Sequence, residues 1–317
     1  MADTTVWISF PLPQNEFDSL ERAFPGCRFF QAAPSSVDPA RIAGVDVLFA
    51  DEPFADELAR QMARLRWLHT TRGGAYPFLS PSVRQRPIQV TCSKGIHGPA
   101  FAEFALASIF ALAKKMQESW EAQRKRQWKR LIPDELAGRT VGIVGLGTVG
   151  SELARKAKAL GLRVLATKRT AAEKPAYVDE LGPPDFLPSL LARSDFVVLS
   201  LAAVPSTENL LGETELRAMK KNAYLINITA AKAVEEKLLV RAVKEGWIAG
   251  AALDALPRQP LPPDSELWGL PNVLISARVG GLSALKWEAL MPIFCDNLRR
   301  FLAGEKLAKL VDKEKGY

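Results

Sequence analysis

The sequence predicts an α/β protein built from two doubly wound parallel sheets. Short apolar runs of four or five residues alternate with helical patterns along most of the chain, and a glycine-rich turn near residue 145 joins one apolar run to a helix. This alternation favours parallel sheets, because parallel strands need crossover connections and these are usually helices. With 317 residues, the chain is long enough for two domains of ordinary size.

In the first part of the chain we expect four strands and a helix between the second and the third. The strands fall at residues 6–10, 45–49, 67–71 and 89–92. Residues 58–65 have helical periodicity. An almost uniformly apolar segment runs from Pro99 to Met116. It is too short and too interrupted to cross a membrane, and it suits a helix buried between domains or at a subunit contact.

A second, more regular β/α series begins at Thr140. Its strands are expected at 141–144, 163–166, 196–199, 224–227, 251–253 and 273–276, with helices between them such as 151–160 and 235–246. Six strands with crossover helices are typical of a nucleotide-binding sheet. Four prolines between 257 and 263 indicate an irregular loop before the last strand. A C-terminal helix over about 284–302 is expected to return to the first part of the chain.

The glycine-rich turn has the pattern G-x-G-x-x-G between a strand and a helix. Gly145 allows the tight turn, Gly147 lets the backbone approach a pyrophosphate, and Gly150 lets the helix and strand pack closely. The start of the helix also offers unpaired N–H groups and the positive end of its dipole to phosphates. We therefore predict a dinucleotide site that comprises Gly145, Leu146, Gly147, Thr148, Val149 and Gly150.

The residues after the second strand of this series indicate which dinucleotide binds. An acidic residue about 20 positions beyond the glycine turn would bind the ribose hydroxyls of NAD. This chain instead has Lys168, Arg169 and Thr170 there. Two cations and a hydroxyl suit an additional 2′-phosphate, so NADP is predicted in preference to NAD. The alternative is a basic pair on an exposed loop without a ligand.

Composition and charge narrow the class of protein. Hydrophobic residues make up 48% and charged residues 24% of the chain, as in soluble globular proteins. The net charge of +7 would allow a nucleic-acid partner, but the densest basic run, 124–130, resembles the polar part of one surface helix. We expect neither nucleic acid nor a membrane as a partner. Three widely spaced cysteines and no secretory signal favour the cytoplasm and predict no metal site.

Ordered matches along nearly the whole chain resemble the D-2-hydroxyacid dehydrogenase family. They comprise residues 95–98, 102–104, the glycine turn, 219–227, 249–254, 259–262 and 267–273. The resemblance implies two Rossmann-like domains: a substrate domain of residues 1–100 plus 284–317, and an inserted dinucleotide-binding domain of residues 101–283. It also implies hydride transfer between a nicotinamide and a 2-oxo or 2-hydroxy acid, by a homodimer.

The three catalytic positions of the family hold other residues here. The resemblance places its arginine at Ala230, its glutamate at Gln259 and its histidine at Arg278. Arg278 remains charged and cannot act as a general acid, but it can bind a carboxylate or polarise a carbonyl. A glutamate beside it would form an ion pair, whereas we expect Gln259 to leave the guanidinium free. The candidates to supply the proton are Lys232, His97, Tyr76 and bound water.

The resemblance also assigns binding roles. Gly73 and Gly74, with Arg72 beside them, align with the loop that holds the substrate carboxylate, and Asp254 aligns with a residue near the nicotinamide carboxamide. Ala230 is expected at the substrate, and further cofactor contacts are expected at Ala202, Thr207, Ile228, Thr229 and Gly280. Structural interpretations compete with these roles. They make His97 a hinge residue, Lys232 a solvated lysine, Asp254 a strand-end aspartate and His69 a satisfied core histidine.

Three functions remain open on this evidence. The first is an NADP-dependent oxidoreductase that reduces a small anionic 2-oxo acid or a related imine, with Arg278 as its cation. The second is a catalytically inactive protein of the same fold that binds NADP as a sensor. The third is a reaction, such as an isomerisation, that uses the nicotinamide transiently.

Overall fold

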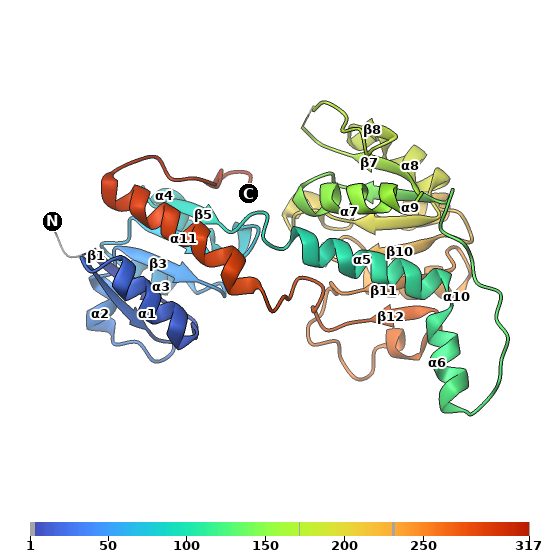
Figure 1. Cartoon of the computed structure of the whole chain (residues 1–317), viewed down its shortest axis with the longest axis horizontal. Helices are drawn as coiled ribbons and strands as arrows, with labels where there is room; N and C mark the ends of the chain where they lie inside the picture. The colour runs from blue at the N-terminus through green and yellow to red at the C-terminus, as the bar shows by residue number, and fades with distance from the viewer. Residues whose placement is uncertain (1–3, 171, 230–231, 317) are drawn as a thin grey trace. The chain divides into compact units, whose positions relative to one another are not determined.

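The computed structural model of the chain describes residues 4–170, 172–229 and 232–316. These form two compact units, one of residues 4–96 with 283–316 and the other of the described residues between 97 and 282. Each unit contains one parallel sheet (Figure 1). The α/β class with two doubly wound parallel sheets is therefore confirmed.

The sheet of the first unit has the order β2-β1-β3-β4-β5. Its strands are β1 (Thr4–Ile8), β2 (Cys27–Gln31), β3 (Val47–Ala50), β4 (Trp67–Thr70) and β5 (Gln89–Cys92). Its helices are α1 (Gln14–Ala23), α2 (Pro39–Ala43), α3 (Asp56–Gln61), η1 (Tyr76–Phe78), α4 (Pro81–Gln85) and α11 (Lys286–Ala303). Strand β2 was not predicted, because it lies at the sheet edge and buries only Phe30, so it has no apolar run to detect.

Helix α11 covers the first sheet, although it comes from the far end of the chain (Figure 1). The ring of Phe294 stacks on Phe49 of β3 with centroids 4.1 Å apart, and on Trp67 of β4 at 5.4 Å. Burial of such large aromatic side chains supplies much of the stability of a core. The C-terminal helix therefore belongs to the core of the first unit.

The sheet of the second unit has the order β12-β11-β10-β9-β6-β7-β8. Its strands are β6 (Thr140–Val144), β7 (Arg163–Thr167), β8 (Glu180–Gly182), β9 (Phe196–Leu199), β10 (Tyr224–Asn227), β11 (Gly250–Leu253) and β12 (Val273–Ile275). β8 was not predicted, because it has three partly exposed residues at the sheet edge. The order reverses between β6 and β9, and ligands of such sheets bind beyond the carboxyl ends of the strands at this point.

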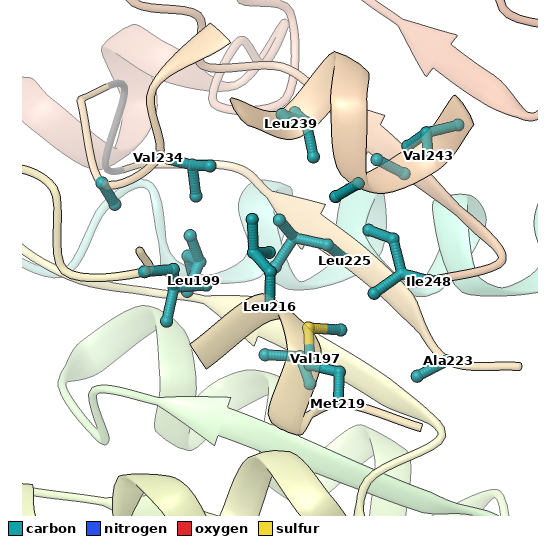
Figure 2. Close-up of a cluster of buried hydrophobic side chains, with 14 of the residues drawn as sticks. Val197, Leu199, Leu216, Met219, Ala223, Leu225, Val234, Leu239, Val243 and Ile248 are labelled. Atoms are coloured by element: carbon teal, nitrogen blue, oxygen red, sulfur yellow. The ribbon is translucent and has the colours of Figure 1, made fainter. Parts of the chain in front are cut away.

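Helices cover both faces of the second sheet. They are α5 (Gly98–Ala113), α6 (Met116–Arg124), α7 (Thr148–Ala159), η2 (Pro184–Phe186), α8 (Leu187–Arg193), η3 (Pro205–Thr207), α9 (Glu213–Ala218), α10 (Glu236–Lys244) and η4 (Glu266–Gly269). α5 and α7 pack against each other on one face. On the other face, Val197 and Leu225 of the sheet meet Leu216 of α9 and Leu239 of α10 (Figure 2).

The basic run 124–130 does not lie on a surface helix as predicted, because α6 ends at Arg124. The run continues as an exposed segment without regular structure. In the part of the chain that the structure describes, no helix combines the length and the apolar character that a membrane span requires.

Candidate functional site

The glycine turn at the carboxyl end of β6 has the backbone that its sequence predicts. Gly145 has a φ of 100°, and a Cβ there would lie 2.7 Å from the carbonyl oxygen of Ser200. A Cβ on Gly150 would lie 2.3 Å from the carbonyl oxygen of Gly145, so helix α7 can approach the strand only with glycine at that position. A Cβ on Gly147 would meet nothing within 4 Å. The turn is thus tightly packed behind and open at Gly147, which fits the approach of a pyrophosphate.

Thr167, the last residue of β7, ties this turn to the neighbouring strand. Its side-chain oxygen accepts from the N–H of Gly145 at 3.1 Å, and its carbonyl accepts from the N–H of Leu146 at 2.7 Å. Lys168 and the exposed Arg169 and Thr170 follow directly in the chain. The residues predicted to bind a 2′-phosphate therefore emerge beside the turn predicted to bind the pyrophosphate.

Two of the predicted cofactor contacts after β9 and β10, Thr207 and Thr229, form hydrogen bonds to backbone carbonyls near the strand ends. The hydroxyl of Thr207 lies 2.8 Å from the carbonyl oxygens of Ala202 and Val204. The hydroxyl of Thr229 donates to the carbonyl of Leu199 at 3.2 Å, and Ile228 is buried. Ala230, predicted at the substrate, lies outside the residues that the structure describes.

Asp254 is buried at the end of β11, and it holds the loop that carries Arg278. Its Oδ1 accepts from the hydroxyl of Ser276 at 2.7 Å and from the N–H of Val279 at 2.8 Å. Its Oδ2 accepts from the N–H of Gly280 at 3.0 Å. These contacts agree with the strand-end interpretation of Asp254, and no contact here tests its predicted role at the carboxamide.

Arg278 is exposed, and its side chain forms a hydrogen bond with Gln259. One guanidinium nitrogen donates to Oε1 of Gln259 at 3.3 Å, and Nε2 of Gln259 donates to the carbonyl of Leu256 at 2.7 Å. We expected Gln259 to leave the guanidinium free, but the hydrogen bond between them orients the guanidinium. The amide is neutral, however, so it does not compensate the positive charge. Among the described residues of this unit, no carboxylate lies within ion-pair distance of Arg278.

The residues predicted to supply a proton have other partners. Nζ of Lys232 lies 3.2 Å from a carboxylate oxygen of Glu208, with 64% of the lysine side chain exposed. Nδ1 of His97 lies 3.1 Å from the carbonyl oxygen of Gly281 and donates to it. Tyr76 lies in the first unit, with the guanidinium of Arg84 over its ring. These contacts join neither Lys232 nor His97 to Gln259 or Arg278.

In the first unit, the guanidinium of Arg72 is already paired. Its Nε donates to the carbonyl of Asp51 at 2.9 Å, and a terminal nitrogen forms an ion pair with Glu52. An anion bound at Arg72 would therefore share the guanidinium with Glu52. The glycine pair remains open, since Gly73 is exposed and a Cβ on Gly74 would meet nothing within 4 Å.

His69 is a buried core histidine, as one interpretation of the sequence expected. Nδ1 lies 2.7 Å from Oγ1 of Thr91, and Nε2 lies 3.0 Å from Oγ of Ser93. Because Ser93 donates its own proton to the carbonyl of Thr70, Nε2 must carry the ring proton and Nδ1 must accept from Thr91. Burial, assisted by the charge of Lys309, lowers the pKa of His69 from 6.5 to about 3.

Sequence reasoning missed Thr167 and Ser276. Both act on a partner more than 20 positions away, Gly145 for Thr167 and Asp254 for Ser276. Their only signal in the sequence was a hydroxyl residue at or just beyond a strand end.

The sequence of this chain is similar to that of known proteins. A model of the NAD binding domain of D-isomer specific 2-hydroxyacid dehydrogenases matches residues 106–280. A glyoxylate reductase from Korarchaeum cryptofilum is 32% identical over 321 residues, which cover 98% of this chain and 96% of that protein.

Two solved structures are also similar. A D-isomer specific 2-hydroxyacid dehydrogenase family protein from Aeromonas salmonicida is 28% identical, with a TM-score of 0.88 over 98% of this chain and 100% of that one. A D-isomer specific 2-hydroxyacid dehydrogenase from Xanthobacter autotrophicus, in complex with NADPH and MES, is 26% identical, with a TM-score of 0.87 and coverage of 100% of both chains.

Proposed function

The chain belongs to the D-isomer specific 2-hydroxyacid dehydrogenase family, and we propose that it is an NADP(H)-dependent reductase of small anionic 2-oxo acids or related imines. Membership of the family makes it an oxidoreductase with a nicotinamide cofactor. The observation that carries the finer proposal is Arg278, which stands where the resemblance places the family histidine and has no carboxylate within ion-pair distance among the described residues of its unit.

The cofactor would lie at the carboxyl edge of the second sheet. The N–H groups of the glycine turn and of the first turn of α7 would hold the pyrophosphate. Lys168, Arg169 and Thr170 would hold a 2′-phosphate, which is the basis for preferring NADP. The relative from Xanthobacter autotrophicus supports this preference, because it was solved with NADPH.

When bound, the reduced nicotinamide supplies a hydride to the carbon of the substrate. Arg278 binds the substrate carboxylate or polarises the carbonyl, because a guanidinium matches the geometry of a carboxylate. It gives no proton, since an arginine stays protonated in a protein. A 2-oxo acid would then take its proton from water, whereas an iminium ion already carries the proton that its nitrogen needs. Imines are therefore natural alternative substrates.

We propose a homodimer that forms through α6 and the segment after it. Trp128 is 99% exposed and Ile132 is 87% exposed, and large apolar side chains that are this exposed indicate a contact surface. The wide spacing of the three cysteines fits a reducing cytoplasm. Sedimentation of the wild type and of a Trp128→Ser variant tests the dimer, and a wild-type monomer at micromolar concentration would exclude it.

The oxidation of NADPH, followed at 340 nm, tests the activity. The purified protein is given a panel of 2-oxo acids that includes glyoxylate, with and without ammonium and primary amines. The proposal predicts oxidation with at least one substrate and loss of it in Arg278→Met. If no member of the panel oxidises NADPH, the reductase proposal fails.

An inactive sensor is the second candidate. The observation that favours it is that Lys232 and His97 are bound to Glu208 and Gly281 and not to Arg278. A sensor would bind NADPH without turnover and would change its oligomeric state. If sedimentation shows no such change, and no substrate is turned over, this candidate fails as well.

A further inference from the structure

The amide of Gln259 can adopt only one orientation that satisfies both of its neighbours. Its nitrogen donates to the carbonyl of Leu256 at 2.7 Å, and its oxygen accepts from Arg278 at 3.3 Å. The reversed amide would place its oxygen against that carbonyl and its two donors against a guanidinium that has donors only. The Leu256 carbonyl thus fixes which atom of Gln259 faces Arg278.

Hydrogen bonds to Asp254 also support the backbone on both sides of Arg278. Arg278 has a φ of 56°, in the left-handed region that side chains other than glycine seldom adopt. Asp254 supports this conformation from both sides, because it accepts from the Ser276 hydroxyl before it and from the N–H groups of Val279 and Gly280 after it. A Cβ on Gly280 would lie 2.8 Å from Oδ2 of Asp254, so the loop and the carboxylate fit closely.

The residue at position 259 decides whether the charge of Arg278 is compensated. A glutamate at position 259 would place a negative charge at the same atom, about 3 Å from the guanidinium, and would compensate it. Glutamine gives the same hydrogen bond without the charge. Asp254 accepts from two backbone N–H groups and a hydroxyl, and none of its hydrogen bonds is to the guanidinium. The loop therefore presents a guanidinium that a hydrogen bond orients and that has no carboxylate partner among the described residues of this unit.

We infer that Gln259 and Asp254 are positioning residues, which hold Arg278 as an oriented and uncompensated cation and so make an anionic group on the substrate a requirement for binding. This inference rests on the proposed function, because it concerns the same site. It adds the residues that set the position and the charge of the cation proposed to bind the substrate carboxylate. It also assigns Asp254 to the Arg278 loop.

The test measures the binding of oxalate by calorimetry, with and without saturating NADPH. Gln259→Glu adds the missing charge with little change in shape but loses the bond to the Leu256 carbonyl, and it should weaken oxalate binding by about tenfold or more, because the guanidinium is then neutralised. Gln259→Met loses that bond and the bond to Arg278 without adding charge, and it should weaken binding by only a few-fold. Gln61→Glu, which adds the same charge at the exposed end of α3 in the first unit, is the matched control and should bind like the wild type.

A second readout separates positioning from mere stability. In Ser276→Ala one of the three bonds to Asp254 is lost, and we expect KM for glyoxylate to rise a few-fold while kcat and the affinity for NADPH stay the same. A purely structural role would lower Tm and leave KM unchanged.

Two results would overturn the inference: a wild type that does not bind oxalate, or a Gln259→Glu variant that binds it as tightly as the wild type. Failure of the proposed function has a different signature, namely normal oxalate binding without oxidation of NADPH by any 2-oxo acid.

Discussion

An arginine at position 278, unlike a histidine, is a permanent cation and cannot exchange a proton with the substrate. We therefore expect Arg278→Met to lower kcat/KM for a 2-oxo acid by roughly 100-fold or more, since an oriented charge at the reacting centre is lost. Arg278→Lys should recover part of this loss, because an ammonium supplies charge but not the two-pronged geometry of a guanidinium. Steady-state assays at saturating NADPH measure both variants. Equal activity of Arg278→Met and the wild type would contradict the role of Arg278.

Lys168 and Arg169 carry the predicted choice of cofactor. We expect the double variant Lys168→Ala/Arg169→Ala to lose roughly 10- to 100-fold in affinity for NADPH, with little change for NADH, because only NADPH has the 2′-phosphate. Quenching of protein fluorescence by each reduced cofactor measures the two affinities. A matched control, Lys158→Ala/Arg155→Ala on α7, removes two cations of the same unit and should keep the wild-type ratio. An unchanged ratio in the Lys168/Arg169 variant would show that the basic pair is only a surface loop.

At the scale of the element, the glycines of the β6–α7 turn have separable functions. Gly150→Ala brings a Cβ to 2.3 Å from the Gly145 carbonyl, so we expect the free energy of unfolding to fall by about 1–3 kcal/mol. Gly147→Ala meets no atom within 4 Å and should unfold like the wild type, while its affinity for NADPH falls, because the added methyl group lies where a pyrophosphate would approach. Urea unfolding and a cofactor titration of both variants separate the two effects. The opposite pattern would contradict this assignment.

The sequence patterns located the buried strands better than the edge strands. The interior strands β9 and β10 have the predicted bounds, since their apolar runs pack against helices on both faces of the sheet. The edge strand β5 also has the predicted bounds, because three of its four residues are buried. The edge strands β2 and β8 escaped prediction because they are partly exposed and lack such runs. In the candidate site, the glycine turn was predictable from one local motif. The bond between Gln259 and Arg278 depends on two loops 19 residues apart, and no local pattern encodes it.

At the scale of the whole molecule, His69 links stability to pH. Its pKa is lowered from 6.5 to about 3 in the folded protein. At pH values between these two, the unfolded chain therefore binds a proton at His69 more readily than the folded protein does. The stability that the neutral ring contributes is fully present above pH 6.5 and is lost as the pH falls towards 3. Between pH 7 and pH 5 this amounts to about 2 kcal/mol in the free energy of unfolding.

The chain has only two histidines, which makes the effect assignable. His69→Asn should unfold more easily at neutral pH but show a much smaller loss between pH 7 and pH 5. His97→Asn should keep the slope of the wild type. Urea denaturation of the three proteins at both pH values gives the comparison, and a wild-type slope in His69→Asn would show that the histidine is not the group responsible.

Calorimetric titration of the purified protein with NADPH, and separately with NADH, tests the account most directly. We predict saturable binding of NADPH with a Kd at least about tenfold below that of NADH, because only NADPH can use the basic residues that follow β7. No heat with either cofactor, or equal affinity for both, would contradict it.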